Sequence, residues 1–288
     1  MLARTQKALP MRSIEALLRG LIDYAGLFPP ASLDLSSAAA NYRTYLGQQY
    51  SWALGRFVVP LSLLEKFAAH REGIADHRLS ILAEPEQFSG LNGPAPPAPV
   101  FEVKIKNPSE VAALRKTLPV QTIYMEVHDG SWTPELFEAV AEAKAGAKIR
   151  TGGVNTNNFA SPKEIVAFMA SCKQAKIPWK ATAGLHHPFP GVHRLRYEPD
   201  SPSAMMHGFL NVFLAATLIH CSEAECFALN LLSERSPKAV TFDDGGITWR
   251  DYRLTTAQIS DTREQFAISF GSCSFTEPIS DLQDLGLL

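Results

Sequence analysis

Residues 100–127 read VFEVKIKNPSEVAALRKTLPVQTIYMEV, and this stretch decides the fold that the sequence predicts. Two short apolar and β-branched runs, 100–105 and 122–127, flank a segment with helical spacing. Asn107-Pro108-Ser109-Glu110 is a helix start signal, because asparagine caps a first turn and proline is tolerated at its first position. The stretch therefore predicts a strand, a helix and a strand, the repeating unit of a parallel sheet with crossover helices.

The same alternation continues on both sides of this unit. Eight strands with intervening helices match a (β/α)₈ TIM-type barrel better than an open doubly wound sheet, which usually has fewer strands. We predict an α/β fold with a single barrel domain over residues 1–288 and an N-terminal helix at 13–19. The predicted strands are 21–27, 56–60, 79–84, 100–105, 122–127, 148–151, 179–185 and 268–275.

One connection is too long for a single barrel helix. Residues 188–266 lie between the seventh and eighth predicted strands and contain several helical patterns. They also contain a hairpin pattern, with strands at 240–242 and 247–250 and a turn at Asp243-Asp244-Gly245-Gly246. We predict a helical and hairpin insertion that serves as a lid, an oligomer contact or part of the scaffold. The sequence is compatible with either a monomer or a homo-oligomer.

The composition excludes several classes of protein. Hydrophobic residues make up 46% and charged residues 19%, which excludes a mainly disordered, collagen-like or coiled-coil chain. With 27 Lys+Arg against 29 Asp+Glu, the net charge of −2 gives no footprint for nucleic acid or an anionic membrane. The four cysteines include no CxxC pair, and no apolar run reaches the length of a membrane span. We expect a cytoplasmic protein without a secretory leader.

Charged residues occur inside the predicted strands. Strand side chains alternate, so one parity faces the helices and the other faces the barrel interior. Two carboxylates, three lysines and one arginine fall on the interior parity, an excess of about two positive charges. This excess suits a small anionic metabolite as partner. The interior set is Glu102, Lys104, Tyr124, Glu126, Lys148, Arg150, Lys180 and Thr182.

These charges either pair with one another without further role or carry out chemistry. They lie toward the carboxyl ends of their strands, where barrel enzymes place their active sites. Lys148 and Lys180 on adjacent strands would lower each other's pKa, and burial would act in the same direction. A neutral lysine attacks a carbonyl to form a Schiff base, and Glu126 or Glu102 could then transfer protons.

Three strand motifs resemble those of a known family: KIRTGG (148–153), KATAG (180–184) and FGSCS (270–274). Their order is similar to that in the deoxyribose-phosphate aldolase group of class I aldolases. The resemblance implies that Lys148 forms the Schiff base, that Lys180 tunes it and that the turn at Gly271 and Ser272 helps to hold phosphate. Arg150 stands where the family has a small polar residue, and the family's Gly-Gly pair after the second lysine is absent.

His186-His187-Pro188 follows the second lysine motif instead. Either histidine could bind substrate or transfer a proton. Alternatively, Glu126 or Glu102 with His186 or His187 could hold a divalent metal, because imidazole with carboxylate suits Zn²⁺, Mn²⁺ or Fe²⁺. The metal set of this alternative is Glu126, His186 and His187.

The leading hypothesis is a lyase of the aldolase type that acts on a small anionic carbonyl compound without a cofactor. Its catalytic residues are Lys148, Lys180, Glu126 and Glu102. Two alternatives remain: a metal-dependent lyase or isomerase, and a non-catalytic barrel that binds a metabolite or a partner protein. The predicted substrate-binding residues are Lys104, Arg150, Thr182, His186, His187, Gly271 and Ser272.

Overall fold

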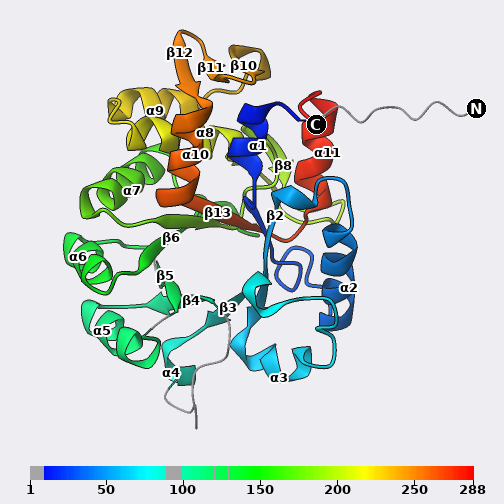
Figure 1. Cartoon of the computed structure of the whole chain (residues 1–288), viewed down its shortest axis with the longest axis vertical. Coiled ribbons are helices and arrows are strands. Elements are labelled where there is room, and N and C mark those ends of the chain that lie inside the picture. Colours follow the sequence, from blue (N-terminus) through cyan, green and yellow to red (C-terminus); the bar gives the residue numbers. More distant parts are fainter. Residues whose placement is uncertain (1–9, 89–98, 120, 129) are drawn as a thin grey trace, which may run out of the picture.

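The computed structural model describes residues 10–88, 99–119, 121–128 and 130–288. Within these residues, eight parallel strands close into a barrel in chain order, and the last strand pairs with the first (Figure 1). The predicted (β/α)₈ barrel is therefore confirmed. The strands are β1 (Ile22–Tyr24), β2 (Leu54–Pro60), β3 (Leu79–Ala83), β4 (Val100–Ile105), β5 (Thr122–Val127), β6 (Gly146–Arg150), β7 (Trp179–Thr182) and β13 (Ala267–Ser272).

Helices surround the barrel, and the helix after β4 starts with the signal that the sequence predicts. The side chain of Asn107 accepts a hydrogen bond from the backbone N–H of Glu110. The helix after β6 also begins with a side-chain cap, because Ser161 forms a capping box with Glu164. The helices are α1 (Arg12–Leu18), α2 (Leu35–Leu46), α3 (Leu64–Phe67), α4 (Pro85–Phe88), α5 (Pro108–Thr117), α6 (Pro134–Glu142), α7 (Pro162–Ala175), α8 (Phe209–His220), α9 (Glu225–Leu232), α10 (Thr256–Gln265) and α11 (Thr276–Asp284).

The long connection between β7 and β13 contains scaffold as well as added elements. All residues of α8 except His220 are buried, and Phe209 stacks on Phe270 of β13 at a ring-centroid distance of 5.4 Å. The α8 helix thus covers the outside of the barrel. The added elements are a hairpin of β8 (Gly191–Arg194) and β9 (Ser203–Met206), and a sheet of β10 (Val240–Asp243), β11 (Gly246–Trp249) and β12 (Tyr252–Thr255).

The sheet contains one strand that the sequence analysis did not predict. The predicted hairpin forms with Phe242 opposite Ile247, and β12 adds a third antiparallel strand beside β11. In Figure 1 this sheet lies beyond α9 and α10, at the edge of the molecule. No helix in the described part of the chain is long and apolar enough to cross a membrane.

Arg263 of α10 ties three elements together at the amino-terminal end of the barrel. Its buried guanidinium donates from Nε to the carbonyl of Leu17 at 2.8 Å and from Nη2 to the carbonyl of Arg19 at 3.1 Å. Its Nη1 donates to the carbonyls of Ala267 and Ile268 at the start of β13. One side chain therefore satisfies carbonyl groups of α1 and β13 that have little access to water.

We expect Arg263→Met to lower the free energy of unfolding by about 3 kcal/mol or more, because several buried carbonyls lose their donor. Urea unfolding followed by circular dichroism measures the change. The matched control is Arg253→Met, which removes an exposed guanidinium that pairs with Asp243 and should leave the midpoint close to that of the wild type. Equal effects of the two substitutions would contradict the role of Arg263.

Candidate active site

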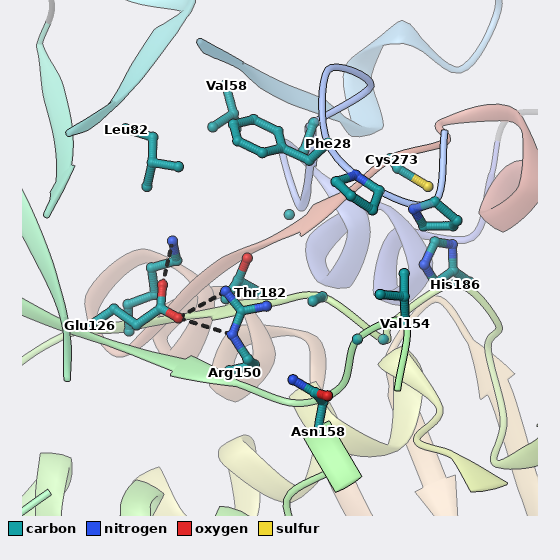
Figure 2. A pocket seen from close by; sticks show the side chains of 18 of the residues that line it. Phe28, Val58, Leu82, Glu126, Arg150, Val154, Asn158, Thr182, His186 and Cys273 are labelled. Atoms are coloured by element: carbon teal, nitrogen blue, oxygen red, sulfur yellow. Dashed lines mark hydrogen bonds and ion pairs between the residues drawn. The ribbon is translucent and has the colours of Figure 1, made fainter. Parts of the chain in front are cut away.

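A cavity of about 340 Å³ opens at the carboxyl ends of the barrel strands. Strands β2 to β7 contribute side chains to it and β13 contributes the backbone of Gly271, while the loop after β1 and the β8–β9 hairpin cover it. This is the face where barrel enzymes place their active sites. Residues that line the cavity include Phe28, Pro29, Pro30, Val58, Leu82, Glu102, Lys104, Glu126, Lys148, Arg150, Val154, Asn158, Thr182, His186, Leu195, Met206, Gly271 and Cys273 (Figure 2).

Buried ion pairs form the floor of this cavity. Lys148 Nζ lies 2.9 Å from Glu102 Oε2 and 2.9 Å from Glu126 Oε2. Lys180 Nζ lies 2.5 Å from Glu102 Oε1 and 2.7 Å from Asp23 Oδ2. None of these five side chains is more than 7% exposed. The structure thus brings together the four predicted catalytic residues, and Glu102 joins the two lysines.

Strand register explains why these side chains meet. Glu126 is the register partner of Lys148 across β5 and β6, and Lys148 is the register partner of Lys180 across β6 and β7. Partners in neighbouring parallel strands point to the same side of the sheet. Charges that the sequence spreads over four strands therefore converge inside the barrel.

Asp23 of β1 belongs to this network, and the sequence analysis missed it. It is fully buried, and its Oδ2 accepts a hydrogen bond from Ser269 Oγ at 2.7 Å. Its Oδ1 accepts from the backbone N–H of Arg56 at 2.5 Å. The sequence contains a signal for it: Asp23 stands between Ile22 and Tyr24, just as Glu102 stands between Phe101 and Val103.

With Asp23 included, the predicted excess of positive charge is wrong. Three carboxylates now face Lys148, Lys180 and Arg150, three cations, so the formal charges of this set cancel. Lys104 adds no net charge, because its Nζ lies 3.0 Å from Glu84 Oε1. The interior is balanced rather than cationic.

The expected lowering of a lysine pKa is also wrong. Burial alone would lower the pKa of Lys148, but the carboxylates of Glu102 and Glu126 outweigh it and raise this pKa above its usual 10.5. Burial likewise acts against Lys180, yet Asp23 and Glu102 raise its pKa further. Each lysine contacts two carboxylates, and their attraction outweighs both burial and the repulsion from the neighbouring lysine. Both amines are therefore protonated at rest.

The two glutamates shift in the complementary direction. Burial alone would raise the pKa of Glu102, but Lys148 and Lys180 hold it well below the usual 4.5. Burial would also raise the pKa of Glu126, but Lys148 and Arg150 lower it. Both carboxylates are therefore ionised at neutral pH, and Ser80 Oγ adds a hydrogen bond of 2.7 Å to Glu102 Oε1.

At the mouth of the cavity, Arg150 is the most accessible of the predicted interior cations. Its side chain is 42% exposed, and its Nε and Nη2 lie 3.1 and 3.0 Å from Glu126 Oε1 (Figure 2). Thr182, Gly271 and the partly exposed Lys104 also line the cavity. Ser272 is not among the described lining residues, and its Oγ accepts instead from the backbone N–H of Ser274 at 3.3 Å.

The two histidines have different surroundings. His186 lines the cavity, and its Nδ1 lies 2.9 Å from Glu277 Oε2 of α11. His187 lines an adjacent hollow instead, with its Nδ1 2.6 Å from Asp281 Oδ2. The ring of His187 stacks on that of His193 at a centroid distance of 3.5 Å. Of the predicted histidine pair, only His186 contributes to the cavity.

The metal-binding alternative is not supported by this geometry. In the described ranges, no three histidine, cysteine, aspartate or glutamate residues form a group suited to hold a metal ion. Glu126 pairs with cations, whereas His186 and His187 each pair with a carboxylate of α11. The predicted set of Glu126, His186 and His187 is therefore not assembled as a metal centre.

Comparison with known proteins gives structural likeness alone. No family model and no curated protein sequence matches the chain. A putative deoxyribose-phosphate aldolase from Coccidioides immitis is similar in structure, with a TM-score of 0.45 and 9% identity over 98% of this chain and 93% of that one. A lysine/ornithine decarboxylase from Vibrio vulnificus, solved with cadaverine, has a TM-score of 0.41 and 12% identity over 92% of this chain and 64% of that one.

We expect Lys180→Met to lower the free energy of unfolding by about 3–5 kcal/mol at neutral pH, because it leaves buried carboxylates without their cation. Lys104→Met is the matched control, since it removes a lysine at the partly exposed rim. Urea unfolding compares both variants with the wild type. A Lys180→Met protein as stable as Lys104→Met would show that the buried charges do not depend on one another.

The lowered pKa of Glu102 also predicts how stability depends on pH. A carboxylate with a lowered pKa stabilises the fold above its unfolded value of 4.5, and this contribution is lost as the pH falls below it. The difference in unfolding free energy between the wild type and Glu102→Gln should be largest near neutral pH and should shrink below about pH 4.5. Urea unfolding at a series of pH values measures it, and a constant difference would contradict the ion pairing.

Proposed function

We propose that the chain is a lyase of the class I aldolase type, which forms a Schiff base between Lys148 and a small anionic carbonyl compound. The supporting observation is that Lys148 lines the cavity at the carboxyl end of the barrel. Among the described lining residues Lys180 is absent, and it is 1% exposed beneath them. A non-catalytic barrel that binds only a partner protein would need no cavity against its interior lysine.

The raised pKa of Lys148 requires a local acceptor for its proton. Glu126 lies 2.9 Å from Lys148 Nζ and takes that proton as the amine attacks the carbonyl carbon. A second proton moves from the nitrogen to the former carbonyl oxygen and gives the neutral carbinolamine. Glu126 then returns the first proton to this hydroxyl group, which leaves as water. The products are one water and an iminium, whose single positive charge replaces that of the ammonium.

The same carboxylates that raise the pKa of Lys148 stabilise the iminium. Its charge stays at the nitrogen of Lys148, close to Glu102 and Glu126. When the carbon–carbon bond one carbon beyond the iminium breaks, its electron pair forms an enamine, and Glu126 takes the hydroxyl proton of the fragment that departs as an aldehyde. Glu126 then returns this proton to the enamine carbon, and water hydrolyses the resulting iminium to free Lys148. Lys180 acts as a positioning residue, because it offsets the charges of Asp23 and Glu102.

The anionic group of the substrate fits the rim of the cavity. Arg150 presents a half-exposed guanidinium there, and only two of its nitrogens contact Glu126. A guanidinium has five N–H donors, which allows it to bind a carboxylate or phosphate while it holds a neighbour. Asn158 and Thr182 lie near Arg150 in Figure 2, and Lys104 also lines the cavity.

Trapping by reduction tests the Schiff base. The protein is incubated with pyruvate or glyceraldehyde 3-phosphate and cyanoborohydride, and the modified peptide is identified by mass spectrometry. We expect an adduct on Lys148 and none in Lys148→Arg, which keeps the positive charge but cannot form the iminium. Lys116→Met, which removes an exposed lysine of α5 outside the cavity, is expected to retain the adduct, and modification of other lysines alone would overturn the proposal.

The pH dependence of trapping tests the role of Glu126. If the proton of Lys148 passes to Glu126, the initial rate should change less than about threefold between pH 6.5 and 8.5. If the proton of Lys148 passes to solvent, only the neutral amine reacts, and below the raised pKa of Lys148 the neutral fraction grows about tenfold per pH unit. The rate of trapping should then rise by the same factor. We expect the flat profile in the wild type and the steep one in Glu126→Gln. A steep wild-type profile would contradict internal transfer.

A further inference from the structure

The wall of the cavity that faces the charges is apolar. The loop after β1 contributes Phe28, Pro29 and Pro30, β2 contributes Val58, and β3 contributes Leu82. Figure 2 shows Phe28, Val58 and Leu82 on one side of the cavity. The polar side chains of Glu126, Arg150 and Asn158 lie on the other side in the same view. The loop after β1 and strands β2 and β3 thus provide apolar side chains to the cavity, whereas β4 to β6 provide charged ones.

The cover of the cavity extends the apolar wall. Leu195 and Met206 at the β8–β9 hairpin are 2% and 5% exposed, and both line the cavity. Val154, in the loop after β6, lines it as well. A substrate group that points from Lys148 toward β2 and β3 therefore contacts apolar side chains of the wall and of the β8–β9 hairpin.

We propose that the substrate is an amphipathic carbonyl compound, a 4-hydroxy-2-oxo acid with its carboxylate on one side of the carbonyl. On the other side, beyond the hydroxyl-bearing carbon that cleavage requires, it carries a branched aliphatic or aromatic group. This inference rests on the proposed Schiff-base function. The carbonyl carbon meets Lys148, the carboxylate meets Arg150, and the apolar group packs on Phe28, Val58 and Leu82. A cavity of about 340 Å³ is within the usual size for a small-molecule site.

The apolar wall selects against sugar phosphates. A hydroxylated chain in this position would lose its hydrogen bonds to water and would find carbon atoms in their place. An aliphatic or aromatic group would instead gain from leaving water, in proportion to the area it buries. The wall therefore favours 2-oxo acids with apolar side chains over polyhydroxylated phosphates.

A substrate series tests the inference by the same trapping reaction. The probes are pyruvate, 2-oxobutanoate, 4-methyl-2-oxopentanoate, phenylpyruvate and 2-deoxyribose 5-phosphate. We expect the half-saturating concentration to fall at least tenfold from pyruvate to 4-methyl-2-oxopentanoate. Equal values for the two acids, or preferential trapping of the sugar phosphate, would overturn the inference and leave the Schiff base in place.

Variants of the wall test its role directly. Val58→Thr and Leu82→Asn change polarity with little change in shape, and neither residue is placed in the catalytic network. We expect each to raise the half-saturating concentration of 4-methyl-2-oxopentanoate at least fivefold and that of pyruvate less than twofold. Val192→Thr on the exposed face of the hairpin is the control, and it should change neither value.

Binding of hydroxy acids separates the two proposals. 2-Hydroxy-4-methylpentanoate and lactate cannot form a Schiff base, so their affinities report on the cavity alone. Isothermal titration should give at least tenfold tighter binding of the branched acid, and Leu82→Asn should remove most of this difference. If that preference appears while no carbonyl probe is trapped, the Schiff base fails and the amphipathic site stands. Equal binding of the two acids would overturn the amphipathic site.

Discussion

Glu102 is the group on which the interior of the barrel depends. Its two oxygens each face a different lysine, so loss of Glu102 would leave both Lys148 and Lys180 with one carboxylate instead of two. Isolated charges at this depth would cost several kcal/mol each, about the whole stability of many domains. The charges persist in the core because Asp23, Glu102 and Glu126 are joined through the lysines into one balanced network.

The same balance determines what chemistry the interior can support. A buried lysine with no carboxylate would lose its proton and become a nucleophile at neutral pH. Here the carboxylates keep Lys148 charged, so its reactivity depends on transfer of the proton within the site. Under the proposed mechanism, such a site stays inactive toward stray electrophiles until a carbonyl compound binds next to Lys148 and Glu126.

Much of the barrel could be predicted from local patterns, because strand alternation and helix caps are short-range features. Glu102, Glu126, Lys148 and Lys180 follow from alternation, since partners on parallel strands share a side of the sheet. The direction of the lysine pKa could not be predicted in the same way. It depends on which charges meet across the closed barrel, and Lys180 contacts a carboxylate 78 residues away. Asp23 lies in the predicted strand 21–27, but this run contains one charged residue, whereas the runs of Glu102 and Lys148 contain two charged residues on the same parity. The partners of His186 and His187 come from α11, whose docking no local pattern encodes.

Closure by β13 has a consequence for how the protein matures. Strands β1 and β7 both pair with β13, and Asp23 and Lys180 meet across it, beside the small residues Ser269 and Gly271. During synthesis, β1 to β7 emerge long before residues 267–272, because the long segment with α8 to α10 comes between them. Until the last strand inserts, Asp23 and Lys180 remain hydrated and apart, and two sheet edges stay open. Open sheet edges of this kind are sites for pairing with other chains, and the contact between Asp23 and Lys180 can form only when β13 closes the barrel.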